Sequence, residues 1–414
     1  MSLDEPQNQL ENWKKKIYTF LASQTISMFG SSLVQYAIIW HVTRETNSGV
    51  MVTLLTISSF LPNMLISPFA GVWADRYNRK LLIILSDSII AISTLVLALL
   101  FIAGHREIWL MCIVAAIRSL GSGVQSPSCS ALIPQLIPRD KLLQINGIHS
   151  SMQSFVNLLA PAFGGFVLSF SSIQNIMFID IITAIIGVTM LATLHIPLHQ
   201  KTTDVVHNGY FTEFKEGLTY AFKNTFVKQL LIFNIFFTFM IVPPALLNML
   251  FVTRYFGDSY VYLALNEMSF FIGSILGGIL IASWGGFKNK LTTVCVACAA
   301  FGALTIVIGM MNIFWIYLVI MVFIGVTMPA FNSPVNALLQ EKVAPDMQGR
   351  VFSIVQIGFV GVMQLGMVIY GPLADIVSLK LLIVINGVLL LIMGIVQSRN
   401  KKFITEGFSK PITE

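Results

Sequence analysis

Long apolar stretches, separated by short polar loops, recur along the whole chain. A helix needs about 20 apolar residues to cross a hydrocarbon core about 30 Å thick, and twelve stretches reach that length. The predicted spans are residues 17–42, 49–74, 81–104, 108–131, 146–170, 174–195, 228–252, 260–284, 291–311, 314–338, 351–374 and 379–398. This pattern predicts an all-α integral membrane protein with twelve transmembrane helices.

One long polar stretch separates the sixth span from the seventh. Within it, Phe211, Phe214, Leu218 and Phe222 recur at helical spacing with charged residues between them, which is typical of an amphipathic helix on the cytoplasmic membrane surface. The chain is therefore predicted to have two six-helix halves, a linker and a tail. These four parts are residues 1–195 (N-terminal half), 196–227 (cytoplasmic linker), 228–398 (C-terminal half) and 399–414 (cytoplasmic tail).

The two halves also echo each other at an offset of about 207 residues. Ser126-Pro127 matches Ser333-Pro334, and Pro138 matches Pro345. A parallel repeat of six spans is the layout of transporters whose two halves rock around a site near the bilayer midplane. Chance alignment of common residues is the alternative.

Composition and charge agree with a membrane protein and give its orientation. Apolar residues make up 56% of the 414 residues and charged residues 11%, with a mean hydropathy of +0.80. Of the 25 Lys and Arg residues, 20 fall in one set of loops and four in the other, and Arg118 lies within a span. Because positive loops stay inside, both termini are predicted to be cytoplasmic. The net charge of +6 then follows the inner membrane face, and no nucleic-acid partner is expected.

The loop between the second and third spans carries a run of charges. Asp75 at the end of the second span is placed to cap the N-terminus of a neighbouring helix, as a clasp that holds the inside closed. Arg76, Arg79 and Lys80 either pair with acidic loop residues of the other half or anchor to anionic lipid. Gly71, one turn earlier, favours a close helix approach.

Three motifs resemble those of the major facilitator superfamily. The stretch Gly71 to Lys80 resembles its loop signature Gly-x-x-x-Asp-Arg-x-x-Arg-Lys, with Trp73 and Asn78 departing from the usual residues. Arg118 to Gly123 resembles its Arg-x-x-Gly-x-Gly motif. The residues Pro161, Gly164 and Gly165 resemble its antiporter motif, with Ala160 in place of the expected Gly.

Over nearly the whole chain the sequence is similar to the macrolide-efflux branch of this superfamily. Gln35-Tyr36-Ala37-Ile38-Ile39, Glu267-Met268-Ser269-Phe270 and Gly349-Arg350-Val351-Phe352-Ser353 carry this similarity. The resemblance implies a monomeric drug and proton antiporter of the cell membrane, one that contributes to multidrug or antibiotic resistance. It also implies that the first, fourth, seventh and tenth helices line a central cavity.

Ionisable side chains inside a bilayer are costly and are therefore candidates for function. Glu267 is the first choice for proton coupling, because a buried carboxyl group can exchange protons near neutral pH and bind a cation in competition. Arg118 and Asp180 are further candidates for proton coupling. The alternative for all three is a structural salt bridge or hydrogen bond. Asp87, two turns beyond the charged loop, is assigned to the clasp.

Polar residues at helical spacing mark a face turned away from lipid. The cavity and substrate candidates on these faces are Gln24, Ser31, Gln35, Ser122, Gln125, Asn234, Thr238, Asn332 and Asn336. Hydrogen bonding between helices, without substrate contact, is the alternative. Pro243-Pro244 is expected to break the seventh span.

Other chemistry is not expected. Cys295 and Cys298 have a metal-like spacing, but they lie in an apolar span without a second pair of ligands, so neither a metal nor a cofactor is predicted. No nucleotide-binding Gly-x-x-x-x-Gly-Lys string occurs, and no enzyme activity is expected. The leading hypothesis is export of lipophilic, often cationic drugs driven by protons. The alternatives are export of an endogenous peptide antibiotic or siderophore, and a non-transporting membrane receptor.

Overall fold

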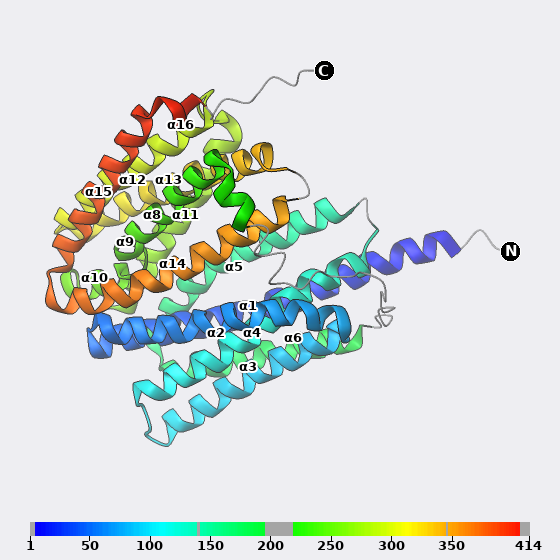
Figure 1. Cartoon of the computed structure of the whole chain (residues 1–414). Helices are drawn as coiled ribbons and strands as arrows, with labels where there is room; N and C mark the ends of the chain where they lie inside the picture. The colour runs from blue at the N-terminus through cyan, green and yellow to red at the C-terminus, as the bar shows by residue number, and fades with distance from the viewer. Residues whose placement is uncertain (1–4, 139–140, 195–217, 345–346, 406–414) are drawn as a thin grey trace. The chain divides into compact units, whose positions relative to one another are not determined.

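The computed structural model describes residues 5–138, 141–194, 218–344 and 347–405, without the side chains of residues 5–12, 75, 143, 349 and 353. Helices make up these ranges almost entirely, and no strand occurs in them (Figure 1). The helices in the first part of the chain are α1 (Glu5–Thr46), α2 (Gly49–Arg76), α3 (Arg79–Ile102), α4 (Ile108–Leu136), α5 (Leu142–Phe170) and α6 (Ile173–Thr193). Those in the second part are α8 (Thr225–Met240), α9 (Val242–Leu246), α10 (Asn248–Tyr255), α11 (Tyr260–Trp284), α12 (Lys290–Met310), α13 (Phe314–Lys342), α14 (Gln348–Ile376), α15 (Leu379–Arg399) and α16 (Lys401–Thr405).

The helices match the predicted membrane spans. Ten of them, α2 to α6 and α11 to α15, are long and apolar enough to cross a membrane, and α8 is a shorter apolar helix. The 42-residue α1 contains the first predicted span, at residues 17–42. The protein is therefore an all-α, multi-pass membrane protein. Several helices extend beyond the predicted limits, because the ends of a helix need not be apolar: α13, for example, continues through Gln340 and Glu341 to Lys342.

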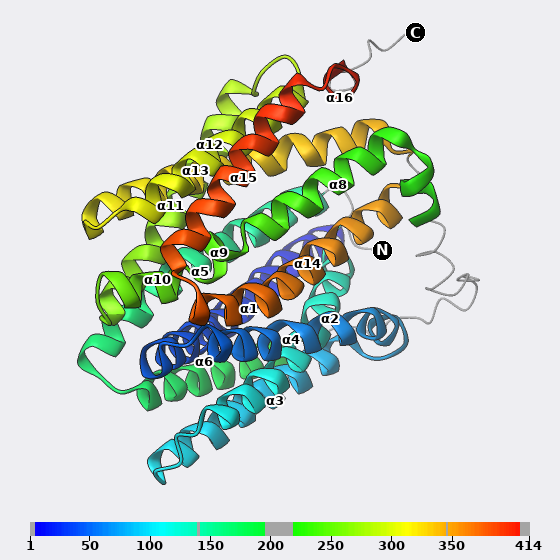
Figure 2. The ribbon, with the colours of Figure 1, turned by 60° about the vertical axis from the view of Figure 1, so that its left-hand side comes forward.

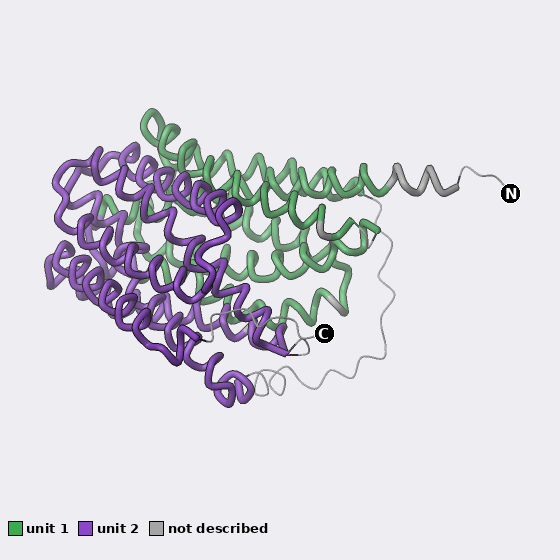
Figure 3. The backbone as a smooth tube through the Cα atoms, turned by 90° about the horizontal axis from the view of Figure 1, so that it is seen from above, with its two compact units in different colours: residues 1–45, 54–204 green, residues 46–53, 205–414 purple. Residues whose placement is uncertain are grey.

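The chain divides into two compact units (Figure 3). Unit 1 comprises residues 1–45 and 54–204, and unit 2 comprises residues 46–53 and 205–414. The first residues of α2 therefore belong to unit 2, and the rest of this helix belongs to unit 1. The predicted amphipathic helix of the linker lies mostly outside the described residues, and only residues 218–223 of it are seen as helix.

Matching helix lengths agree with the repeat that the sequence indicates. Both α4 and α13 have 29 residues, both α5 and α14 have 29, and both α6 and α15 have 21. The starts of α3 and α12 also use the same device. Asn78 accepts a hydrogen bond from the backbone N–H of Leu81, and Asn289 accepts one from that of Leu291, so each asparagine caps its helix.

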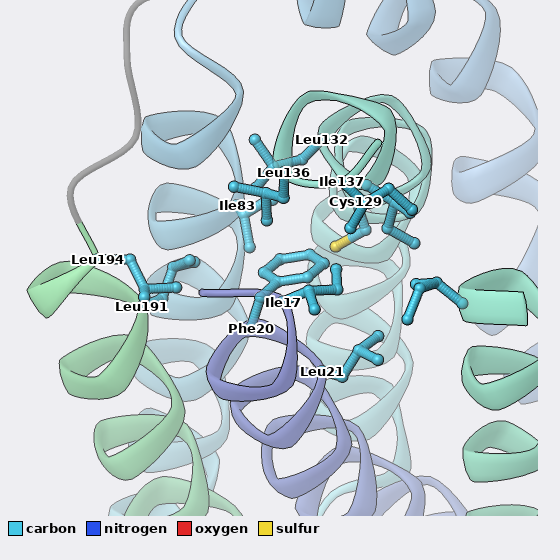
Figure 4. Close-up of a cluster of buried hydrophobic side chains, with 12 residues drawn as sticks. Ile17, Phe20, Leu21, Ile83, Cys129, Leu132, Leu136, Ile137, Leu191 and Leu194 are labelled. Carbon is cyan, nitrogen blue, oxygen red and sulfur yellow. The ribbon is translucent and has the colours of Figure 1, made fainter. Parts of the chain in front are cut away.

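Unit 1 is held together by a buried apolar cluster at one end of α1 (Figure 4). Ile17 and Phe20 of α1 pack with Ile83 of α3, Leu132 of α4 and Leu191 of α6, and all five are fully or almost fully buried. Lipid is as apolar as these side chains, so close packing rather than water exclusion stabilises such contacts. The cluster fixes α1 against three other helices and so positions the polar side chains further along α1.

In unit 2, α11 packs closely against α13 at Gly277. A Cβ atom added at Gly277 would lie 2.7 Å from the Cα of Val326, whereas a Cβ at Gly278 would meet no atom within 4 Å. Glycine at position 277 therefore allows the two backbones to touch.

This contact gives a prediction with an adjacent control. We expect Gly277→Ala to destabilise the protein by about 1–3 kcal/mol, because the methyl group overlaps the backbone of α13. Gly278→Ala, at which the described structure leaves open space, is expected to change stability little. The midpoint of thermal unfolding in detergent would measure both, and equal midpoints would contradict the tight crossing.

The seventh predicted span is broken, as the sequence indicates. It forms α8, α9 and α10, which follow one another along one path (Figure 2). Pro243 and Pro244 lie in the five-residue α9. Because proline lacks the N–H that continues a helix, the helix is interrupted here, and the next helix begins at the buried Asn248.

Candidate functional site

The Arg118 side chain of α4 forms a buried ion pair with Asp180 of α6. Their atoms Nη1 and Oδ2 lie 2.6 Å apart, and 8% of Arg118 and none of Asp180 is exposed. Thr94 of α3 donates to the same carboxylate and accepts from Arg118, while Ser31 of α1 donates to Asp180 through Oγ and accepts from Arg118 through its carbonyl oxygen. We call these four residues the ion-pair tier. Arg118 and Asp180, two of the proton-coupling candidates, neutralise each other in this ion pair.

A second polar cluster lies on three of these four helices, α1, α3 and α4. Gln125 of α4 donates to Oδ1 of Asp87 at 2.5 Å and contacts the side-chain oxygen of Gln24 at 3.4 Å, and Cys129 donates to that oxygen at 3.0 Å. We call Gln24, Asp87, Gln125 and Cys129 the Asp87 tier. The sequence interpretation placed Asp87 in the loop clasp; the structure instead buries it among neutral side chains, with 2% of it exposed.

Glu267 of α11 is buried in unit 2, with 8% of it exposed. Its carboxyl group faces the side-chain amide of Asn248, the residue that begins α10 after the break in the seventh span. Tyr317 of α13 lies near this carboxyl group and donates to Asn266, the residue before Glu267. Among the described residues no Lys, Arg or His forms an ion pair with Glu267. When the Glu267 carboxyl group is ionised, binding of a cation or a proton can therefore neutralise its charge.

Two predicted cavity residues, Asn234 and Thr238, line a pocket in unit 2. They lie one turn apart on α8, and Thr238 donates to Asn234 at 3.3 Å. The pocket has an empty volume of about 600 Å³ between α8, α14 and the helical segment 218–223, and Ile235, Ile354 and Phe359 are among its apolar lining residues. Its lining is mostly apolar, with one amide, one hydroxyl group and the side chain of Lys228, which suits a lipophilic ligand with a few polar atoms.

The remaining predicted cavity residues are not gathered into this pocket. Ser122 is half-buried on α4, while Gln35 on α1 and Asn332 and Asn336 on α13 are exposed. Their role as substrate contacts stays a prediction.

The charged loop uses its basic residues to hold helix ends within unit 1. Arg79 donates to the carbonyl oxygens of Ala74 and Ala131, each at 2.7 Å, and Lys80 donates to those of Ala192 and Leu194. Cations at the C-terminal ends of helices satisfy carbonyl groups and the helix dipole. Arg76 is exposed, and the side chain of Asp75 lies outside the described residues. Beside Gly71, the described atoms leave room for a Cβ, so the close approach expected there is not seen.

The predicted antiporter motif lies in α5. Pro161, Gly164 and Gly165 are all buried, and a Cβ at Gly164 would lie 3.5 Å from Leu33 of α1. The motif therefore packs α5 against α1 inside unit 1. This position is compatible with a role in transport and does not test it.

One charged centre was missed by the sequence interpretation. Asp375, at the end of α14, accepts hydrogen bonds from the backbone N–H groups of Gly49 and Val50 at 2.7 and 3.0 Å and from the Ser48 hydroxyl at 2.7 Å. Carboxylates at helix N-termini are stabilised by the free N–H groups and the helix dipole. Asp375 thus caps α2, the kind of contact that the sequence predicts for Asp75.

Arg254 of α10 completes this centre, which we call the α2 cap (Asn47, Ser48, Gly49, Val50, Arg254 and Asp375). Its Nη2 atom lies 2.6 Å from Oδ1 of Asp375 and 2.7 Å from the carbonyl oxygen of Asn47. A signal for it exists in the sequence: Gly371-Pro-Leu-Ala-Asp375 repeats the Gly-x-x-x-Asp spacing of Gly71-Val-Trp-Ala-Asp75. Gly371 is needed for the approach, because a Cβ there would overlap Thr53 of α2.

Comparisons with known proteins find relatives that match most of the chain. It is 28% identical over 387 residues to macrolide efflux protein A of Streptococcus pyogenes, covering 93% of this chain and 96% of that protein. It is 22% identical over 382 residues to the staphyloferrin A transporter of Staphylococcus aureus, covering 89% and 92%. The solved structure of a D-xylose-proton symporter shares the fold, with a TM-score of 0.70 at 14% identity over 96% of this chain and 99% of that one.

The family assignment rests on most of the sequence. The sequence model of the Major Facilitator Superfamily matches residues 20–366, which include the charged loop, the ion-pair tier, the Asp87 tier and Glu267. The helical, multi-pass architecture agrees with this match. The chain therefore belongs to the Major Facilitator Superfamily, whose members are transporters of small molecules and not enzymes.

Proposed function

We propose that this protein exports lipophilic, often cationic compounds of the macrolide type across the cell membrane. Export is coupled to proton influx, and the two halves alternate in opening to either side. The observation that carries this proposal is Glu267, a buried carboxyl group inside a membrane span, with no ion-pair partner in the described part of the chain. The similarity to macrolide efflux protein A supports the substrate class.

The position of Glu267 suits exchange of a proton for a cation. An isolated charge in a bilayer is costly, so the carboxyl group favours binding either a proton or a cationic group. Asn248, which faces it, begins α10 just after the broken part of the seventh span. Movement of α10 relative to α11 would therefore change the surroundings of Glu267, and this links the proton to the conformation.

The pocket between α8 and α14 supports a lipophilic substrate. Its apolar lining provides area for an apolar skeleton, and Asn234 and Thr238 provide a few polar contacts. Such a combination favours broad specificity, because apolar contact does not depend on exact geometry. We propose that this pocket in unit 2 binds the substrate.

Inverted membrane vesicles test the proposal. A pH difference of about one unit, acid inside, is worth about 1.4 kcal/mol per proton and drives about tenfold accumulation when one proton is exchanged. We expect radiolabelled erythromycin to accumulate in vesicles that contain the protein and to be lost on adding a protonophore. Glu267→Gln is expected to abolish this accumulation.

Glu107→Gln is the matched control, because Glu107 is an exposed loop residue at the start of α4. It should accumulate erythromycin as the unmodified protein does. Accumulation that resists the protonophore would refute proton antiport. Normal accumulation by Glu267→Gln would instead remove Glu267 from the coupling path.

A second substrate class is favoured by one observation. The similarity to the staphyloferrin A transporter supports export of an endogenous metabolite such as a siderophore. Vesicles that accumulate an iron-free siderophore, and not erythromycin, would establish this alternative. A non-transporting receptor is not retained, because the chain belongs to a family of transporters.

The proposal includes the orientation and the assembly. The distribution of Lys and Arg supports a cytoplasmic location of both termini, and the protein is expected to act as a monomer. Site-directed labelling of cysteines introduced at the two ends of α3 would test the orientation.

A further inference from the structure

The polar residues of unit 1 are spaced seven residues apart on three helices. Gln24 and Ser31 lie on α1, Asp87 and Thr94 on α3, and Gln125 and Arg118 on α4. Seven residues are two helical turns, or about 10 Å along the helix. The ion-pair tier and the Asp87 tier are therefore two levels of one polar column, built by the same faces of the same helices.

The two levels differ in charge balance. In the ion-pair tier, Arg118 balances Asp180 at 2.6 Å. In the Asp87 tier, every direct contact of the carboxyl group is neutral. Gln125 donates to Oδ1, and the buried Oδ2 accepts no hydrogen bond from any described residue. An ionised carboxylate with an unsatisfied oxygen is costly inside a membrane protein.

The side chains around Asp87 come from α1, α4 and α6. Gln24 and Ser27 of α1 are neutral, and Gln125 of α4 is an amide. The Cys129 thiol of α4 lies nearby, and Asp180 of α6 adds a negative charge from the other tier, where Arg118 already pairs with it. No described cation therefore compensates Asp87.

We propose that Asp87 is a second proton-binding site of this transporter, located in unit 1, in addition to Glu267 in unit 2. This inference rests on the proposed proton-coupled export and extends it. The proton binds Oδ2, which becomes a donor, and the side chains of Gln24 and Ser27 face the same carboxyl group. The proton arrives from the outside and leaves to the cytoplasm, and the carboxyl group carries no charge while the proton is bound.

The site also explains an otherwise unsatisfied amide. Neither the Nε2 atom of Gln24 nor the Oδ2 atom of Asp87 has a hydrogen-bond partner among the described residues. Two buried polar atoms without partners in one cluster are unusual. Rearrangement of Gln24 when Asp87 loses its proton would satisfy both atoms, because the amide can then donate to the charged carboxylate.

The first test separates coupling from substrate exchange. In proteoliposomes, Asp87→Asn mimics the protonated carboxyl group. One pH unit drives about tenfold accumulation of erythromycin by the unmodified protein, and we expect Asp87→Asn to lose most of it. It should still exchange labelled for unlabelled erythromycin across the membrane, which requires no net proton movement. Asp87→Glu, which keeps the acid, is expected to restore part of the accumulation.

Infrared spectroscopy of the purified protein in lipid tests the site without any substrate. We expect C=O absorption from protonated carboxyl groups near neutral pH, and loss of the Asp87 component of this absorption in Asp87→Asn but not in Glu107→Gln. Identical spectra for Asp87→Asn and the unmodified protein would overturn the inference, as would full accumulation by Asp87→Asn. If the unmodified protein transports no erythromycin, the proposed function fails, and the infrared band still decides whether Asp87 binds a proton.

Discussion

Replacing Asp180 by asparagine is expected to destabilise the protein by about 3–5 kcal/mol, because the change leaves a buried arginine without its carboxylate. Asp180 is fully buried, and the other hydrogen bonds that Arg118 donates to described residues go to the Thr94 hydroxyl and the Ser31 carbonyl oxygen. The expected result is a large fall in the midpoint of thermal unfolding in detergent. Fluorescence-detected size-exclusion chromatography after heating would measure it.

A double substitution distinguishes lost pairing from lost space. Arg118→Met combined with Asp180→Asn removes both charges, and replacing a buried ion pair by neutral residues is often close to neutral in stability. We therefore expect the double variant to recover most of the loss. If Asp180→Asn alone unfolds at the same midpoint as Glu107→Gln, the ion pair does not stabilise unit 1, and a functional role for Asp180 gains support.

Replacing Asp375 by asparagine is expected to release the first residues of α2. Hydrogen bonds to a charged group contribute about 1.5–3 kcal/mol each, and Asp375 accepts from two backbone N–H groups and one hydroxyl of this segment. Because the cap is partly exposed, we expect a net loss of about 2 kcal/mol, which is about a thirtyfold change in a local opening equilibrium. Amide hydrogen exchange at Gly49 and Val50 should increase accordingly.

The partner arginine provides a graded comparison. Arg254→Gln removes one of the bonds to Asp375 but leaves the carboxylate on the N–H groups of α2, so exchange at Gly49 and Val50 should increase less than in Asp375→Asn. Equal exchange in both variants and the unmodified protein would show that the α2 cap does not hold this segment. Because α2 passes from unit 2 into unit 1 at residue 54, slower transport in Asp375→Asn is also expected.

The membrane spans could be predicted because each one is a local property of the sequence. Twenty apolar residues in succession are incompatible with a water-exposed element, whatever packs beside them. The break in the seventh span was also predictable, since Pro243 and Pro244 remove N–H groups from the helix itself. Helix ends were less predictable: α4 continues to Leu136 and α14 begins at Gln348, because polar residues at a membrane surface can stay helical.

The site was predicted only in part. The sequence selected Arg118, Asp180 and Glu267 correctly as buried ionisable residues, because each interrupts an apolar span. It did not reveal that Arg118 and Asp180 neutralise each other, and it assigned Asp87 to the loop clasp. The α2 cap was missed because Asp375 lies at a helix end, where a carboxylate usually faces water.

The sequence by itself determined that this protein crosses the membrane many times, which faces of its helices are polar, and that three motifs resemble those of one transporter superfamily. All of these follow from the order of residues along single helices. Only the tertiary structure decided which buried charge has a partner: Arg118 lies beside Asp180, two turns from Asp87, and Asp375 reaches α2 from the end of α14. Charge balance depends on distances between helices far apart in the sequence, and helical periodicity does not specify those distances.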